Sequence, residues 1–146
     1  NYPYCCTIVN RRVLIKQKLN NMNKNIFGDP LITCSNDPLT GFFRNGCCDT
    51  DSNDLGLHTV CIITTKEFLQ FSKKAGNDLS TSRTEWGFNG LNPGDRWCLC
   101  ALRWKEAFDN GCAPIVVLEA TNEKTLDVIP IKDLIKFAHK EIKEVK

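Results

Sequence analysis

The stretch GDRWCLCALRW, residues 94–104, decides the fold because it joins a turn, a strand and a helix. The turn formers Asn92-Pro93-Gly94-Asp95 suit entry into a strand, so residues 96–100 are predicted to be extended. The spacing of the large side chains then predicts a helix that begins near residue 102 and ends at Asn110-Gly111. A strand that passes directly into a helix is therefore the centre of the predicted fold.

The two cysteines of this stretch, Cys98 and Cys100, have different meanings on different backbones. On a helix they would lie about 200° apart around the axis, whereas on a strand they share a face. Sharing a face would let them act together as metal ligands or as thiols. The preferred interpretation is that they are buried cysteines packed beside Trp97 and Trp104.

Strand patterns occur at three further places in the chain. Residues 57–63, LHTVCII, are short and β-branched, and residues 115–120, IVVLEA, are typical of a buried strand. Residues 125–129, TLDVI, are predicted to pair with that second strand. These segments indicate a small sheet.

Helix patterns flank these strands. Thr64 followed by Glu67 predicts a capping box, with a helix that ends at Gly76-Asn77. The last segment carries a single apolar stripe, which predicts an amphipathic helix docked on the core. The stripe consists of Ile131, Leu134, Ile135, Ala138, Ile142 and Val145.

Two long polar segments, residues 28–56 and 77–95, are rich in turn formers and are predicted to be ordered loops. The predicted fold class is α+β: a compact two-layer single domain with a small sheet, about three helices and these two loops. Residues 22–146 are assigned to this globular domain, and residues 1–21 to a basic N-terminal extension. That extension is read as a start-site artefact or family-specific arm, with an organelle-targeting segment as the alternative.

The composition excludes several classes of protein. The chain has 146 residues, of which 42% are hydrophobic and 25% are charged, and it lacks the run of about 20 apolar residues that a membrane helix needs. The net charge of +2 does not favour binding to nucleic acid. The charge is unevenly placed, however, because the segment before Asp29 contains five basic residues and no acidic residue. The oligomeric state is left open.

Nine cysteines indicate the redox compartment. The count is odd, two pairs are adjacent in sequence (Cys5-Cys6 and Cys47-Cys48), and no Asn-x-Ser/Thr glycosylation motif occurs. These features predict reduced thiols and a cytoplasmic protein.

A zinc site is the first chemical hypothesis. The candidate ligands are Cys34, Cys47, Cys48, His58, Cys61, Cys98 and Cys100. The chain has no Cys-x-x-Cys pair, and a strand over 57–63 would place His58 and Cys61 on opposite faces. No cofactor is therefore predicted; the metal alternative left open uses Cys34, Cys48, His58, Cys98 and Cys100.

The segment DTDSND, residues 49–54, resembles the start of a calcium loop. Asp54 stands where an EF-hand needs glycine, and Val60 stands where it needs glutamate. The segment is therefore predicted to be a solvated acidic turn.

A cysteine nucleophile would need a base and a group that orients the base. His139 is predicted to face solvent from the last helix, which makes His58 the candidate base. The candidate nucleophiles are Cys34, Cys48 and Cys98, and the candidate orienting groups are Asp78 and Asp95.

The polar residues of the long loops, together with a neighbouring tryptophan, form a candidate binding site for an anionic or amide-bearing small molecule. They are Thr40, Arg44, Asn77, Asp78, Arg83 and Trp97, with Asp95 beside them. The alternative is that these residues hold the loops by Asx-turns and ion pairs.

Four motifs, GDRWCLCALRWKEA, DPLTGFFRNGCC, GLHTVC and GNDLST, carry a resemblance to a known family. The chain resembles the domain-of-unknown-function family 2237, small proteins known mainly from bacteria, over about residues 25–134. The resemblance implies a compact α+β, two-layer fold and no established activity. The motif positions shared here include Cys34, Thr40, Arg44, Cys48, His58, Asn77, Asp78, Asp95, Trp97 and Cys98. The chain departs from the family pattern at Ser82, Thr84, Asn89 and Asn122.

Three functions follow as hypotheses, and whether the protein is an enzyme is left open. The first is a polar, cysteine-lined small-molecule site formed by loops 28–56 and 77–95. The second is a metal-binding or thiol-based protein. The third is an interaction module that uses the basic N-terminal arm.

Overall fold

The computed structural model describes residues 23–140. Within that part of the chain, three strands form an antiparallel sheet in the order β2-β1-β3. The strands are β1 (His58–Ile63), β2 (Arg96–Cys100) and β3 (Ile115–Val116). The predicted strands at 57–63 and 96–100 are confirmed, and β2 passes directly into a helix as expected.

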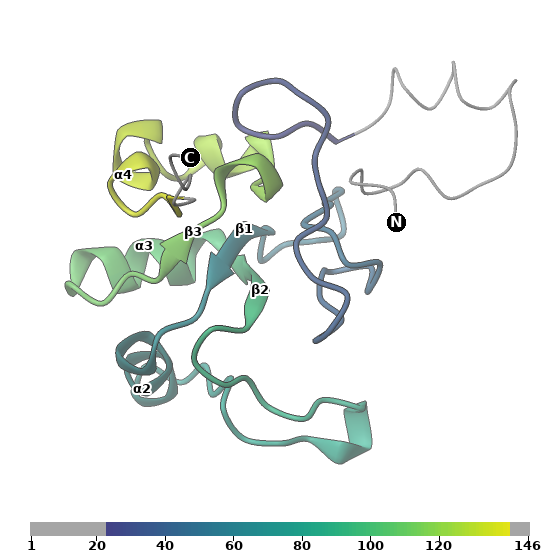
Figure 1. The fold of residues 1–146 in the computed structure, drawn as a ribbon, viewed down its shortest axis with the longest axis vertical. Coiled ribbons are helices and arrows are strands. Elements are labelled where there is room, and N and C mark those ends of the chain that lie inside the picture. The colour runs from purple at the N-terminus through teal and green to yellow at the C-terminus, as the bar shows by residue number, and fades with distance from the viewer. Residues whose placement is uncertain (1–22, 141–146) are drawn as a thin grey trace, which may run out of the picture.

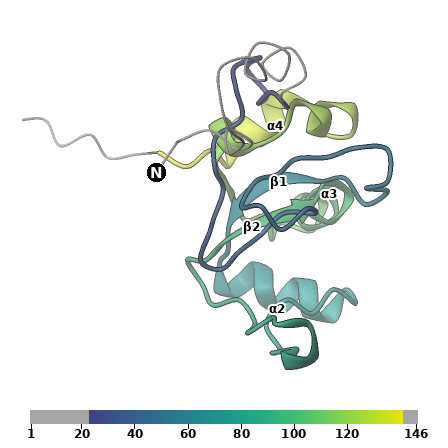
Figure 2. The same ribbon diagram turned by 90° about the vertical axis from the view of Figure 1, so that its right-hand side faces the viewer.

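The helices of the described residues contribute side chains to one common core. They are α2 (Lys66–Lys74), α3 (Ala101–Asp109) and α4 (Ile131–Lys136), with short 3-10 turns η1 (Thr84–Trp86), η2 (Leu118–Ala120) and η3 (Glu123–Asp127). Figure 1 shows the segment before β1 on the opposite side of the sheet from these helices. Figure 2 shows the strands between α2 and α4. The predicted α+β class is confirmed.

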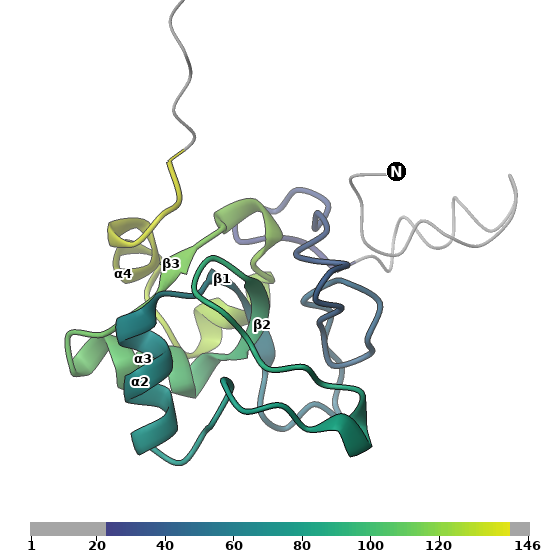
Figure 3. The same cartoon turned by 60° about the horizontal axis from the view of Figure 1, so that its bottom comes forward.

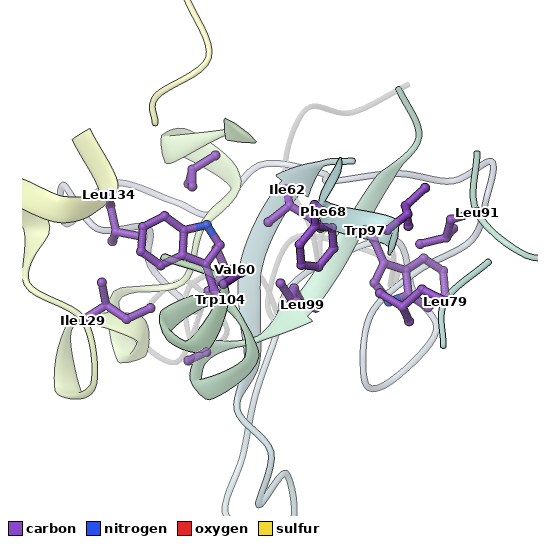
Figure 4. Close-up of a cluster of buried hydrophobic side chains, with 14 of the residues drawn as sticks. Val60, Ile62, Phe68, Leu79, Leu91, Trp97, Leu99, Trp104, Ile129 and Leu134 are labelled. Carbon is purple, nitrogen blue, oxygen red and sulfur yellow. The ribbon is translucent and has the colours of Figure 1, made fainter. Parts of the chain in front are cut away.

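Successive side chains of β1 and β2 point alternately into two cores, one on each face of the sheet. Val60, Ile62 and Leu99 belong to the larger core, which contains Phe68 of α2 and Trp104 of α3. Figure 4 shows Ile62, Phe68 and Leu99 between the two ends of this core, one around Trp97 and the other around Trp104. The other face of the sheet presents a smaller core with a different composition. Its buried members are Cys34, Cys48, Cys61, Cys98, Val117 and Ala120.

Helix α2 begins one residue later than the capping box predicts. Thr65, not Thr64, is the N-cap of α2 and accepts a hydrogen bond from the Phe68 N–H. The Thr64 hydroxyl instead donates to the Asn92 and Asp95 carbonyls and so ties β1 to the turn before β2. This tertiary contact removes Thr64 from the cap.

The segment after α3 departs most from the sequence prediction. Only Ile115–Val116 is a strand, and the predicted strands over 115–120 and 125–129 continue as the 3-10 turns η2 and η3. These turns let Thr121 and Thr125 point back to β1, where their hydroxyls bond the Cys61 N–H and the Thr59 hydroxyl. Buried polar partners therefore override the strand propensity.

The last predicted helix is shorter than its apolar stripe. It ends at Lys136, after which Ala138 forms a parallel bridge with Val116. Leu134 is fully buried, whereas Ile131 and Ile135 are exposed, so these two residues of the predicted docking face do not pack into the core. The prediction for residues 142–145 lies outside the described residues, as do those for residues 1–21.

The two predicted loops are confirmed. Between residues 28 and 56 the backbone forms only isolated bridges, and between residues 77 and 95 it forms only η1 and one bridge. Figure 3 shows the 77–95 loop extending away from α2 and the sheet. None of the helices described within residues 23–140 is long and apolar enough to cross a membrane.

Candidate functional site

A cavity of about 230 Å³ lies along the edge strand β2. It is lined by His58, Asn77, Leu79, Trp97, Cys98, Leu99, Cys100 and Arg103. The lining therefore comes from the first residue of β1, the start of the 77–95 loop, β2 and the first turn of α3. His58, Asn77, Trp97 and Cys98 were predicted site residues, and this cavity brings them together.

Cys100 occupies the junction of strand and helix. It is the last residue of β2 and the N-cap of α3, so the positive end of the α3 dipole lies at this position. Its thiol is free and partly exposed. The other free thiol within residues 23–140 belongs to Cys112, which does not line the cavity.

His58 stands beside Cys100 because of the strand register. The two residues are Cα partners at the end of the β1–β2 ladder, where the register shifts between His58 and Val60. Directly opposed residues in an antiparallel pair have Cβ atoms about 4.5–5.5 Å apart. Such irregularities redirect side chains and often lie next to active sites.

A buried carboxylate holds the His58 imidazole. Asp54 Oδ1 lies 2.6 Å from His58 Nδ1, and the Asp54 side chain is fully buried. The same carboxylate accepts hydrogen bonds from the His58 N–H and from the Thr50 hydroxyl. The Phe42 ring stacks on the imidazole at 6.1 Å between centroids. Since the carboxylate accepts, Nδ1 donates, and Nε2 of the neutral ring is left to act as an acceptor or base.

This geometry corrects the prediction for residues 49–54. The acidic turn is not solvated at its end: Asp54 is only 3% exposed, and Asp49 is equally buried. The Asp54 carboxylate orients His58, a role that the sequence analysis assigned to Asp78 or Asp95. Sequence reasoning missed Asp54 because a loop has no periodicity that would place it opposite His58.

Arg103 contributes a cation to the cavity wall. Its Nη1 atom donates to the Ala75 carbonyl at 3.0 Å and contacts Glu106 Oε1 at 3.4 Å. These contacts hold the guanidinium between α2 and α3, and a guanidinium carries five N–H donors in all. The sequence analysis placed Arg103 on the predicted helix and among the positions shared with the family, but did not include it among the candidate site residues.

The candidate nucleophiles Cys34, Cys48 and Cys98 all form disulfides in this structure. Cys34 is disulfide-bonded to Cys61, and Cys48 to Cys98, with Cα–Cα distances of 5.8 and 5.3 Å. Each of these four cysteines is buried. The expectation of reduced thiols is therefore wrong for them, while the predicted cytoplasmic compartment stays a prediction.

The two carboxylates predicted to orient His58, Asp78 and Asp95, instead accept hydrogen bonds within their own turns. Asp95 Oδ2 accepts from the Asn92 N–H and closes the turn before β2, at the opposite end of that strand from Cys100. Asp78 accepts from the Ser80 and Thr81 N–H groups and from the Thr81 hydroxyl. Neither carboxylate lines the cavity.

The remaining binding candidates, Thr40, Arg44 and Arg83, do not line the cavity. The buried Thr40 hydroxyl accepts from the Cys98 N–H at 2.8 Å, and the Arg44 guanidinium lies 5.1 Å from the Trp97 ring centroid. Arg83 forms a backbone bridge with Phe88 in the 77–95 loop. For Thr40 and Arg83, the alternative interpretation, residues that hold the loops, fits these contacts better than ligand binding.

We expect the substitution Thr81→Val to change the titration of Asp78. The hydrogen bond from the Thr81 hydroxyl, followed by backbone N–H groups and the Lys73 charge, holds the pKa of Asp78 below its ordinary value. The ionised Asp78 carboxylate therefore stabilises the folded state at pH values above its ordinary pKa. This contribution is lost as the pH falls through the lowered folded-state pKa. In Thr81→Val the Asp78 pKa should rise, which an NMR titration of the carboxyl measures. An unchanged midpoint would show that the hydroxyl does not perturb Asp78.

The fold and the site together define a class: an α+β domain with a buried cysteine cluster and a polar cavity that carries a free thiol. The chain belongs to the family described as uncharacterized protein conserved in bacteria (DUF2237), whose model matches residues 24–138. The predicted resemblance is confirmed. A comparison with curated proteins finds no match.

Proposed function

We propose that this protein binds a small anionic molecule in the cavity and attacks it with the Cys100 thiol. The observation that carries the proposal is the convergence of a free thiol, an imidazole held by a buried carboxylate, and an arginine on one cavity. Cysteine nucleophiles need such a base and such an orienting group.

The roles follow from the positions of the groups. His58 Nε2 takes the thiol proton, since Asp54 holds Nδ1. Arg103 and Asn77 supply the donors that recognise a carboxylate or phosphate. Trp97 and Leu79 give the cavity an apolar wall for the rest of the ligand.

The reaction class that suits this arrangement is acyl transfer from a small carboxylate-bearing ester. Cys100 Sγ bonds to the acyl carbon, and the thiol proton passes to His58. The alcohol leaves with that proton as the carbon–oxygen bond breaks. Water then hydrolyses the thioester, which releases the acid and restores the thiol.

Alkylation with iodoacetate and iodoacetamide tests the proposal, with Cys112 as the control in the same molecule. Cys112 is free and partly exposed, but Glu67 lies 4.0 Å from its sulfur and no imidazole adjoins it among the contacts described. Cys100 should react faster with the anionic reagent than with the neutral one because of Arg103, and Cys112 should show the reverse preference. Peptide mass spectrometry gives both rates.

The variants His58→Ala and Asp54→Asn should slow Cys100 by about 100-fold, the lower end of general-base effects, and leave Cys112 unchanged. A carboxylate-bearing 4-nitrophenyl ester should release nitrophenolate with the unmodified chain and not with Cys100→Ala. Equal alkylation rates at the two cysteines, unaffected by His58→Ala, would refute the assignment.

A further inference from the structure

We propose that the buried cysteine cluster is a zinc site in the reduced protein. This cluster consists of Cys34, Cys48, Cys61 and Cys98. The sulfur atoms of the first three all lie within 4.8 Å of one another. The Cys98 sulfur is bonded to Cys48, and its Cα is the register partner of Cys61. The cluster does not include the proposed nucleophile Cys100, although Cys98 also lines the cavity.

The spacing of the sulfurs has the scale of a zinc–thiolate centre. Zinc binds thiolates at about 2.3 Å in a tetrahedron, which places the sulfurs about 3.8 Å apart. The donor set consists of soft thiolates, which select zinc over calcium or magnesium.

The backbone at each cysteine is held independently of the disulfides. The Cys34 N–H donates to the Gly46 carbonyl, the Cys61 N–H to the Thr121 hydroxyl, and the Cys98 N–H to the Thr40 hydroxyl. The Cys48 carbonyl accepts from the Asn122 side-chain amide. Reduction therefore leaves four thiols at preorganised positions, as a metal site requires.

This arrangement also gives Asn122 a role. Asn122 is 1% exposed and is one of the positions at which the chain departs from the family pattern. Its side-chain carbonyl oxygen caps η3 by accepting from the Lys124 N–H. Its side-chain nitrogen donates to the backbone carbonyl of Cys48. It positions the loop that carries Cys48 and does not line the cavity.

The conversion is balanced by a dithiol reductant. Each disulfide takes two electrons and two protons from one dithiol, which itself becomes a disulfide. Zn²⁺ then replaces the protons of the four thiols. In the reverse direction, a disulfide-bearing oxidant takes two electrons from each thiolate pair and becomes a dithiol, while the pair becomes a disulfide and releases the metal. The cluster thus exchanges a covalent crosslink for a metal crosslink.

The test compares metal content in the two redox states of the full chain. The protein is reduced with a phosphine, which becomes a phosphine oxide, incubated with zinc sulfate and freed of excess metal by gel filtration. Elemental analysis should find one zinc per chain after reduction and none in the oxidised protein. Absence of stoichiometric zinc in the reduced, folded protein would overturn the proposal.

Variants place the metal. Cys61→Ser should weaken zinc binding by more than the roughly 100-fold that an outer-shell loss costs, whereas Cys112→Ser and Cys100→Ser should bind as the unmodified chain does. Zinc retained by Cys61→Ser would place the metal on other cysteines and refute the site. Should that variant not fold, Co²⁺ bound to the unmodified reduced chain should show thiolate charge-transfer absorption. Its absence would refute the site equally. Because Cys100→Ser keeps the zinc and loses the reactive thiol, this proposal and the proposed function fail separately.

Discussion

Replacing both Cys48 and Cys98 by alanine is expected to lower the free energy of unfolding of the oxidised protein by about 4 kcal/mol. The disulfide between them closes a loop of 50 residues, and the chain-entropy relation gives about this value for such a loop. The bond joins the loop before β1 to the edge strand β2, so its loss frees a long segment of the unfolded chain. Urea unfolding followed by far-ultraviolet circular dichroism, with a metal chelator present, measures the change.

Cys112→Ala is the matched control, since Cys112 carries a free and partly exposed thiol. We expect that variant to change the free energy of unfolding by less than about 0.5 kcal/mol. The pair Cys34 and Cys61 closes a shorter loop of 27 residues and should cost somewhat less than the pair Cys48 and Cys98. A change below about 1 kcal/mol in the Cys48, Cys98 double variant would show that the crosslink does not constrain the unfolded chain.

The disulfide pattern marks the limit of sequence reasoning here. Cys34 pairs with Cys61, 27 positions away, and Cys48 pairs with Cys98, 50 positions away. Tertiary packing brings each pair together, and no local sequence pattern indicates either pairing. Adjacent Cys47 and Cys48 and the odd cysteine count indicated free thiols. The sheet register brings Cys61 and Cys98 together on one face, and only the loop geometry then chooses their partners.

Elements with a strong local pattern were predicted well. β1 and the junction of β2 and α3 carry short apolar runs bounded by turn formers, so their type follows from propensity. The 3-10 turns η2 and η3 replace predicted strands because buried threonines after β3 need partners on β1. Periodicity does not detect such polar requirements.

The candidate site was predicted in part for the same reason. His58 and Trp97 stood on predicted strands next to the loops, and the structure places both at the cavity. Asp54 and Arg103 were missed as site residues, because their roles depend on contacts across the chain. The register of β1 against β2 would have exposed the pairing of His58 with Cys100.

Trp104→Ala is expected to lower the free energy of unfolding by about 4 kcal/mol, within the range for large aromatic truncations in cores. The Trp104 side chain is fully buried at the end of the core that joins α3 to α4, as Figure 4 shows beside Ile129 and Leu134. The indole stacks on Phe108 at 5.3 Å between centroids.

The loss has two physical parts. Truncation leaves a cavity that the packed elements cannot fill, and it removes the N–H donor that bonds the Pro114 carbonyl at 3.3 Å. Trp104→Phe keeps most of the volume and loses the donor, so it should cost less than the alanine variant. Trp86→Ala is the control, since Trp86 is 78% exposed on η1 and should change the free energy of unfolding by less than about 0.5 kcal/mol. Equal effects of the two alanine variants, measured by urea unfolding and circular dichroism, would contradict a core built around Trp104.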